Sequence, residues 1–256
     1  MLPRDRVTAA LANDDAHPAI VAYLTAGYPS PDTFLDTLRR VCAAADAVEI
    51  GVPFSDPMAD GVTIQRSSRV AIEHGVTLRW ILDRLGARDF ALEAPVLLMS
   101  YLNPLLAFGY AALAARAAEV GVAGFLVPDL PYEECGPLRE ALDTHGLALV
   151  QFVTPATPPE RMRRVCAASQ GFVYAVTKTG ITGGASALPA DLTTYLTAVK
   201  NAATLPVCAG FGVRDAAQVR SIAAHADGVI VGSALVEVLE RGEDPAEFLR
   251  SLRSAQ

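Results

Sequence analysis

Short apolar runs of strand length recur along the whole chain. They are continuous rather than alternating in polarity, as expected for parallel strands that are covered by helices on both faces. The runs are Ala19–Ala26, Ala47–Gly51, Pro95–Met99, Gly124–Val127, Leu147–Val153, Phe172–Val176, Pro206–Ala209 and Gly228–Val231. We therefore predict eight buried parallel strands.

Segments with helical periodicity separate these runs. In the first of them, Phe34, Leu38 and Val41 recur at intervals of three and four residues, which places them on one face of a helix. The predicted helices include Pro31–Ala45, Tyr110–Val120, Tyr132–Thr144, Pro158–Ala168, Asp191–Ala202 and Asp215–Ala224. The first residues of the chain begin a further, charged helix.

Regular alternation of strand and helix, with no long polar linker, favours one closed barrel. We predict an α/β fold, a single (β/α)8 TIM barrel with an additional N-terminal helix, spanning residues 1–256 as one domain. Length alone also permits two small domains. An open doubly wound sheet is the alternative, but it would require a GxGxxG motif after the first strand, and Thr25–Pro29 does not supply one.

Composition narrows the classes of ligand and compartment. The formal net charge of −7 argues against nucleic acid as a partner, so a phosphate ligand would need local backbone N–H groups to hold it. The four cysteines are scattered and form no CxxC pair, which is typical of core residues in a reducing compartment. With no signal peptide at the start of the chain, we expect a cytoplasmic protein.

The most hydrophobic stretch, residues 95–115, is too interrupted to cross a membrane. Ser100, Asn103, Pro104 and Gly109 break it before it reaches the length of a bilayer span. We therefore expect no membrane association.

Glu49 is the first candidate for chemistry, because it is a charged residue inside an apolar strand. Burial disfavours the ionised carboxylate, so the pKa of Glu49 should rise and the group could shuttle a proton. The alternative is a structural ion pair inside the barrel. Active sites of such barrels lie at the carboxyl ends of the strands, and Glu49 stands near the carboxyl end of its strand.

Asp60 is the second candidate, in the loop after the same strand. Taken alone, an Asp-Gly pair indicates only a turn or a helix cap. Its nearness to Glu49 at one mouth of the barrel favours a working pair of carboxyl groups.

Glycines cluster after the last three strands, at 180–184, 210–212 and 232. Bare backbone N–H groups after strands seven and eight, with a helix N-terminus behind Ser233, are typical of the phosphate site of these barrels. Apolar and aromatic residues also gather at strand ends, where they form either a core layer or a flat slot for an aromatic ligand. They are Tyr23, Met99, Tyr101, Leu126, Phe152, Tyr174 and Phe211.

The run from Val48 to Gln65, VEIGVPFSDPMADGVTIQ, closely resembles the signature of the tryptophan synthase alpha-chain family. Further matches extend the resemblance over nearly the whole chain. They are Tyr101 with Asn103-Pro104, VPDLP at 127–131, Tyr174 to Gly183, Gly210–Gly212 and Val231–Ala234.

The resemblance implies retro-aldol cleavage of indole-3-glycerol phosphate to indole and glyceraldehyde 3-phosphate. Glu49 would be the general acid/base and Asp60 would stabilise the indole N–H, supported by Tyr174 and Thr182. The phosphate would be held by Gly183, Gly212, Gly232 and Ser233, and the indole would lie among Tyr23, Met99, Tyr101, Leu126, Phe152 and Phe211.

The resemblance also implies a partner. This is a beta subunit that carries pyridoxal phosphate, receives indole and joins this chain in an alpha2-beta2 complex, with Asp56 and Pro57 at the contact. No metal or organic cofactor is expected on this chain. Two alternatives stay open, namely a stand-alone lyase that releases indole and a catalytically silent phosphate-binding barrel.

The chain departs from the family pattern at a few positions. Thr177 stands where Ser is usual, Lys178 where Arg is frequent, and Ile181 where Val is frequent, all near the loop that closes over the site. Tyr23 stands where Phe is common, which adds a hydroxyl that needs a partner at the pocket wall.

Overall fold

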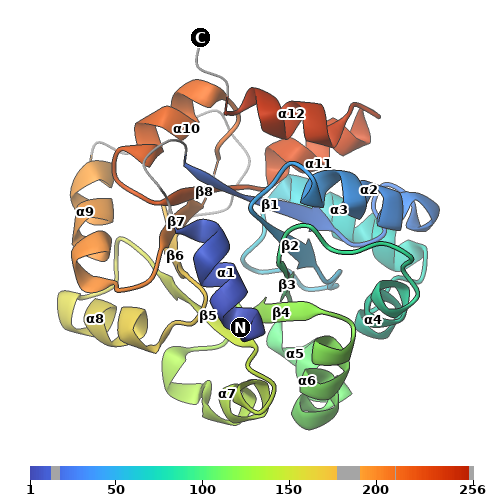
Figure 1. The fold of residues 1–256 in the computed structure, drawn as a ribbon, viewed down its shortest axis with the longest axis horizontal. Coiled ribbons are helices and arrows are strands. Elements are labelled where there is room, and N and C mark those ends of the chain that lie inside the picture. The colour runs from blue at the N-terminus through green and yellow to red at the C-terminus, as the bar shows by residue number, and fades with distance from the viewer. Residues whose placement is uncertain (13–17, 178–190, 211, 254–256) are drawn as a thin grey trace.

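A closed barrel of eight parallel strands forms the centre of the molecule (Figure 1). The computed structural model describes residues 1–12, 18–177, 191–210 and 212–253. Each strand pairs with the next in chain order, and the last pairs with the first. The strands are β1 (Ala19–Thr25), β2 (Ala47–Gly51), β3 (Val96–Met99), β4 (Val122–Leu126), β5 (Ala148–Val153), β6 (Val173–Val176), β7 (Val207–Gly210) and β8 (Gly228–Val231). The predicted barrel is confirmed, and the open sheet is wrong.

Helices surround the barrel and connect its strands. They are α1 (Pro3–Leu11), α2 (Phe34–Cys42), α3 (Val62–Glu73), α4 (Leu78–Gly86), α5 (Leu102–Phe108), α6 (Tyr110–Glu119), α7 (Gly136–Asp143), α8 (Pro159–Ala168), α9 (Leu192–Ala202), α10 (Ala216–Ala223), α11 (Ser233–Glu240) and α12 (Pro245–Ser251). Two short 3-10 helices, η1 (Pro31–Thr33) and η2 (Tyr132–Glu134), precede α2 and α7.

Helix α1 closes the end of the barrel where the strands begin (Figure 1). Val7 and Leu11 are fully buried and belong to the cluster that fills the barrel interior. The Thr8 hydroxyl donates a hydrogen bond to the carbonyl of Gly171, just before β6, at 2.9 Å. The additional N-terminal helix is therefore confirmed, and it leaves the opposite end of the barrel for ligands.

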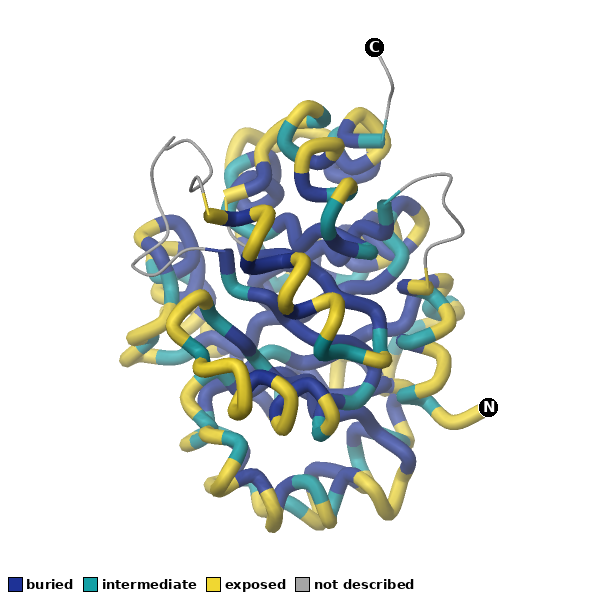
Figure 2. Tube along the Cα trace, turned by 90° about the vertical axis from the view of Figure 1, so that its left-hand side faces the viewer, coloured by how far each residue is buried: buried dark blue, intermediate teal, exposed yellow. Residues whose placement is uncertain are grey.

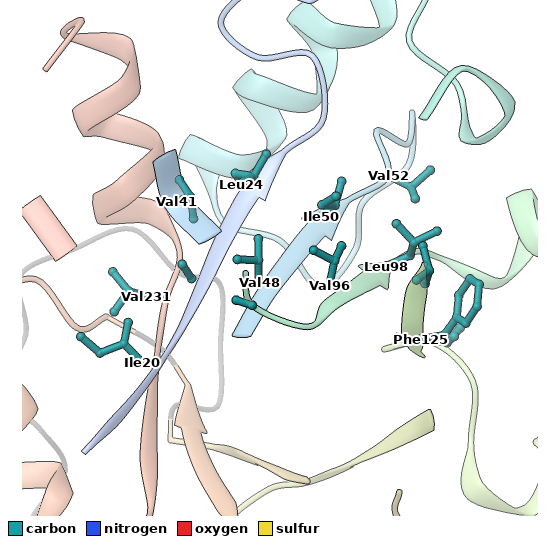
Figure 3. Close-up of a cluster of buried hydrophobic side chains, with 14 of the residues drawn as sticks. Ile20, Leu24, Val41, Val48, Ile50, Val52, Val96, Leu98, Phe125 and Val231 are labelled. Carbon is teal, nitrogen blue, oxygen red and sulfur yellow. The ribbon is translucent and has the colours of Figure 1, made fainter. Parts of the chain in front are cut away.

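Alternate residues of each strand pack on two different cores. Outward residues such as Ile20, Val48 and Ile50 pack with helix residues such as Val41 (Figure 3). Inward residues fill the barrel. Because both faces are covered, the strands are buried along their length while the outer helix faces are exposed (Figure 2). This double burial is why the strands read as continuous apolar runs.

The boundaries of several elements differ from the prediction. The helix predicted over Pro31–Ala45 begins as η1 and ends at Cys42. The helix predicted over Tyr132–Thr144 is divided, because Pro137 fits the first turn of a new helix rather than the interior of a long one. Strand β4 begins two residues before the predicted Gly124, next to an irregularity in its pairing with β3.

Other predictions from composition can be compared with the structure. All four cysteines are free and buried, as predicted for core residues. Within the described ranges, no helix is both long and apolar enough to span a membrane.

Candidate active site

Glu49 points into the barrel near the carboxyl end of β2. In the sheet register it lies between Tyr23 of β1 and Leu97 of β3. Parallel neighbours in register have side chains on the same face, so these three side chains all point into the barrel. Two residues further along β2 and β3, Gly51 pairs with Met99, so Glu49 lies one layer below the barrel mouth.

The Glu49 carboxyl group is buried, and one of its two oxygens lacks a hydrogen-bond partner among the described residues. The residue is 1% exposed, and that oxygen is Oε1. Burial raises the pKa of Glu49 to about 8. No basic side chain of the described residues forms an ion pair with it, which disfavours the structural ion pair considered above.

Asp60 lies in the loop between β2 and α3, and it is half-buried. The Tyr101 hydroxyl donates a hydrogen bond to its Oδ2 at 3.1 Å, and the Gln65 side-chain amide donates to its backbone carbonyl at 2.8 Å. Burial raises the pKa of Asp60 to about 6, while the bond from Tyr101 opposes that rise. At neutral pH, Asp60 is therefore ionised and Glu49 is mostly protonated.

Two buried tyrosines lie within electrostatic range of both carboxyl groups. Burial is the main cause of the raised pKa of Tyr23, followed by the charge of Asp60, with a smaller effect of Glu49. The pKa of Tyr174 is raised by burial and then by Glu49 and Asp60. Glu49 and Asp60 therefore both lie near Tyr23 and Tyr174.

Glycines at two strand ends leave room for these rings. A Cβ atom on Gly51 would lie 2.1 Å from the Tyr23 hydroxyl oxygen, and one on Gly210 would lie 2.4 Å from that of Tyr174. Both distances are far inside van der Waals contact. Any larger residue at Gly51 or Gly210 would displace a tyrosine from the wall of the site.

The remaining apolar candidates line the same interior. Met99 packs against the cluster of Tyr23 and also against the interior cluster that contains Leu126 and Tyr174. The rings of Phe152 and Tyr174 lie 4.8 Å apart at a tilt of 36°. Leu126 is fully buried, so it supports this wall from within the core.

The phosphate candidates Gly232 and Ser233 directly follow β8, and Gly232 lies near Tyr23. Gly232 is the N-cap of α11, and its carbonyl accepts the N–H groups of Leu235 and Val236 at 2.9 and 3.1 Å. Ser233 is the first residue of α11, so its backbone N–H is one of the N-terminal donors that have no partner within the helix and attract anions. A Cβ atom on Gly232 would lie 3.8 Å from the Tyr23 Cβ atom. Tyr23 therefore lies beside this seat and, through the strand register, beside Glu49.

Some of the remaining predicted site residues lie within the residues that the structure describes, and others lie outside them. Gly212 is exposed, with a φ of +84° that glycine adopts readily. Thr182, Gly183, Phe211 and Lys178 lie outside the described residues. The sequence pattern did not predict a site role for Gln65, because its hydrogen bond to the Asp60 carbonyl depends on how the loop folds back on α3.

Asp56 and Pro57 lie on the outer side of the Asp60 loop. Asp56 is exposed and accepts a hydrogen bond from the Ser55 hydroxyl at 2.5 Å, while the neighbouring Met58 is 81% exposed. A groove of about 510 Å³ lies beside the loop and along α3. Its lining residues are Phe54, Ser55, Pro57, Val62, Gln65, Arg66, Arg69 and Ile72.

Comparison with known proteins gives one consistent result. Residues 9–255 match the family model described as tryptophan synthase alpha chain. The tryptophan synthase alpha chain of Nitratidesulfovibrio vulgaris (strain DP4) is 43% identical over 235 residues, which are 91% of each chain.

Solved structures agree. Tryptophan synthase subunit alpha from Legionella pneumophila str. Paris has a TM-score of 0.86 and 33% identity, covering 99% of this chain and 97% of that chain. A chain of Mycobacterium tuberculosis tryptophan synthase has a TM-score of 0.85 and 33% identity over the same shares. The barrel with its buried glutamate therefore belongs to the tryptophan synthase alpha-chain family, the lyase component that cleaves indole-3-glycerol phosphate.

Proposed function

We propose that this chain carries out the cleavage of indole-3-glycerol phosphate with Glu49 as the general acid/base and Asp60 as the electrostatic partner of the indole nitrogen. The observation that carries the proposal is the state of Glu49. It is buried in the barrel, its Oε1 has no hydrogen-bond partner among the described residues, and its pKa is about 8. A carboxyl group that is neutral at pH 7 has a proton to give.

The cleavage uses that proton and then restores it. Glu49 transfers its proton to C3 of the indole, which leaves the ring nitrogen cationic. The resulting carboxylate accepts the proton of the glycerol hydroxyl as the carbon–carbon bond breaks. The electron pair of that bond returns to the ring, the hydroxyl carbon becomes the aldehyde of glyceraldehyde 3-phosphate, and Glu49 is protonated again.

Asp60 acts on the charge that appears on the ring nitrogen. A fixed, ionised carboxylate stabilises the cationic intermediate more than the neutral substrate, so it lowers the barrier rather than only tightening binding. The pKa of about 6 keeps Asp60 ionised at neutral pH even though burial raises it. The opposite protonation states of Glu49 and Asp60 suit their two roles.

We assign the rest of the substrate by the same geometry. The indole lies among Tyr23, Met99, Leu126 and Phe152, with Tyr174 of β6 supporting the acid from the opposite side of the barrel. The phosphate lies at Gly212, Gly232 and Ser233, where the start of α11 supplies backbone N–H groups. Thr182, Gly183 and Phe211 complete the site in this proposal.

The family works with a beta subunit in an alpha2-beta2 complex, and pyridoxal phosphate belongs to that subunit. The alpha chain itself carries no cofactor. We propose that Asp56 and Pro57 contact the beta subunit, because their loop is exposed and also carries Asp60. Binding of the beta subunit to this loop would then directly affect the position of Asp60. We further place the protein in the cytoplasm, as is usual for a biosynthetic enzyme of this family.

The function is tested by mixing the purified chain with indole-3-glycerol phosphate, with and without a beta subunit, and following indole. We expect slow cleavage by the chain alone and an increase of about 5- to 150-fold with the beta subunit, the usual range for coupling between sites. Absence of indole in both mixtures would refute the activity of this site. Equal release in both would indicate a stand-alone lyase.

The two carboxyl groups predict a bell-shaped dependence of kcat/KM on pH. Activity requires ionised Asp60 and protonated Glu49, so kcat/KM should fall below about pH 6 and above about pH 8. Steady-state rates between pH 5 and 9.5, with folding monitored at each pH, provide the measurement. A profile that keeps rising above pH 8.5 would contradict a protonated Glu49.

A further inference from the structure

Tyr101 links two strand ends through its hydroxyl group. It follows β3 as the N-cap residue of α5, and it is 4% exposed. Its hydroxyl donates to Asp60 Oδ2 at 3.1 Å and accepts the N–H of Ala59 at 2.9 Å. Its ring stacks on Phe54 at 5.1 Å, with 25° between the ring planes. Both bonds and the stacked ring belong to the loop that carries Asp60.

The two bonds give the Tyr101 hydroxyl a fixed direction. Because the oxygen accepts from Ala59, its own proton is left to point at the Asp60 carboxylate. Such a bond favours the ionised carboxylate. It therefore lowers the pKa of Asp60 against the effect of burial.

The loop has few other means of holding that carboxylate. Residues 53–61 form no helix or strand, and Met58 within them is 81% exposed. The bond from Gln65 and the turn from the Asp60 N–H to the Pro57 carbonyl, at 3.2 Å, hold only the backbone. Among the described residues, the hydrogen bond to the carboxylate itself comes from Tyr101.

We propose that Tyr101 is a positioning residue, which orients the Asp60 carboxylate toward the slot before substrate binds, rather than only a wall of that slot. The inference rests on the proposed role of Asp60. It assigns to the hydroxyl a function that the aromatic ring alone cannot perform. The bond joins residues 41 positions apart, so it connects the segment after β3 to the loop after β2.

Tyr101→Phe separates the two roles, because phenylalanine keeps the ring on Phe54 and removes the hydroxyl. We expect kcat/KM to fall by about tenfold to a hundredfold, the range for losing a hydrogen bond to a charged group. We also expect the acid limb of the pH profile to move above about pH 6, because the ionised form of Asp60 loses its donor. Titration of the Asp60 carboxyl carbon by NMR should show the same direction in the absence of substrate.

Tyr195→Phe is the matched control, since it removes another buried hydroxyl, which donates to the Val153 carbonyl at 2.8 Å. It should leave the acid limb and the Asp60 titration in place. If Tyr101→Phe also leaves them in place, or leaves turnover unchanged while Asp60→Asn abolishes it, the positioning role is overturned. If Asp60→Asn itself cleaves at the wild-type rate, the proposed role of Asp60 fails instead.

Discussion

Glu49→Gln should abolish cleavage while leaving ligand binding nearly intact. Glutamine keeps the size of the side chain but has no proton to transfer to C3 and cannot accept one from the glycerol hydroxyl. General acid–base catalysis contributes about 10²–10⁴ in rate, and both transfers depend on this group, so we expect at least that loss in kcat. The measurement is indole release at saturating substrate with the beta subunit present.

Affinity for a phosphate ligand should stay within a few-fold in this variant. The seat at Gly232 and Ser233 lies at the start of α11, on a different segment of the chain from the strand and loop that carry the carboxyl groups. Glu73→Gln, on the exposed face of α3, is the matched control and should cleave as wild type. Wild-type turnover by Glu49→Gln would remove Glu49 from the mechanism.

The same variant should be more stable than wild type at neutral and alkaline pH. The Glu49 carboxyl ionises at about pH 4.5 in the unfolded chain and at about pH 8 in the folded protein. Between these values the folded state holds more protons than the unfolded state. The free energy of unfolding therefore falls as pH rises, by up to about 1.4 kcal/mol per pH unit, and the accumulated loss is a few kcal/mol at pH 8.

Glutamine does not titrate, so the variant should escape this loss. Denaturant unfolding of both proteins at pH 4.5, 6, 7 and 8 gives the difference in the free energy of unfolding. We expect a difference that grows in favour of Glu49→Gln as pH rises and levels off above about pH 8. A difference that does not change with pH would mean that Glu49 has an ordinary pKa in the folded protein. Asp60 titrates in both proteins, so its effect cancels.

Secondary structure follows closely from local pattern in this protein. The strand predicted at Ala47–Gly51 has those bounds, and the one at Gly228–Val231 does too. Burial on both faces demands apolar residues at every position, and that demand is visible in the sequence. The predicted boundaries were wrong where strand pairing or a short 3-10 helix determines them, as at β4 and before α2.

The candidate site could be predicted from the sequence pattern only in part. Glu49 stands out because a carboxylate inside an apolar strand is costly to bury. The use of the Tyr101 hydroxyl was not predictable, since it depends on the loop after β2 meeting the end of β3. The same holds for the fit of Tyr23 over Gly51, which follows from strand register.

By itself, the order of apolar and polar residues determined eight βα units and put a carboxyl group where water is excluded. Those features depend on residues close together in the chain, so local periodicity and composition are sufficient for them. Only the closed barrel decided which groups Glu49 and Asp60 meet and hence how far their pKa values rise. Desolvation and hydrogen bonding depend on neighbours from distant strands, and barrel closure brings those neighbours together.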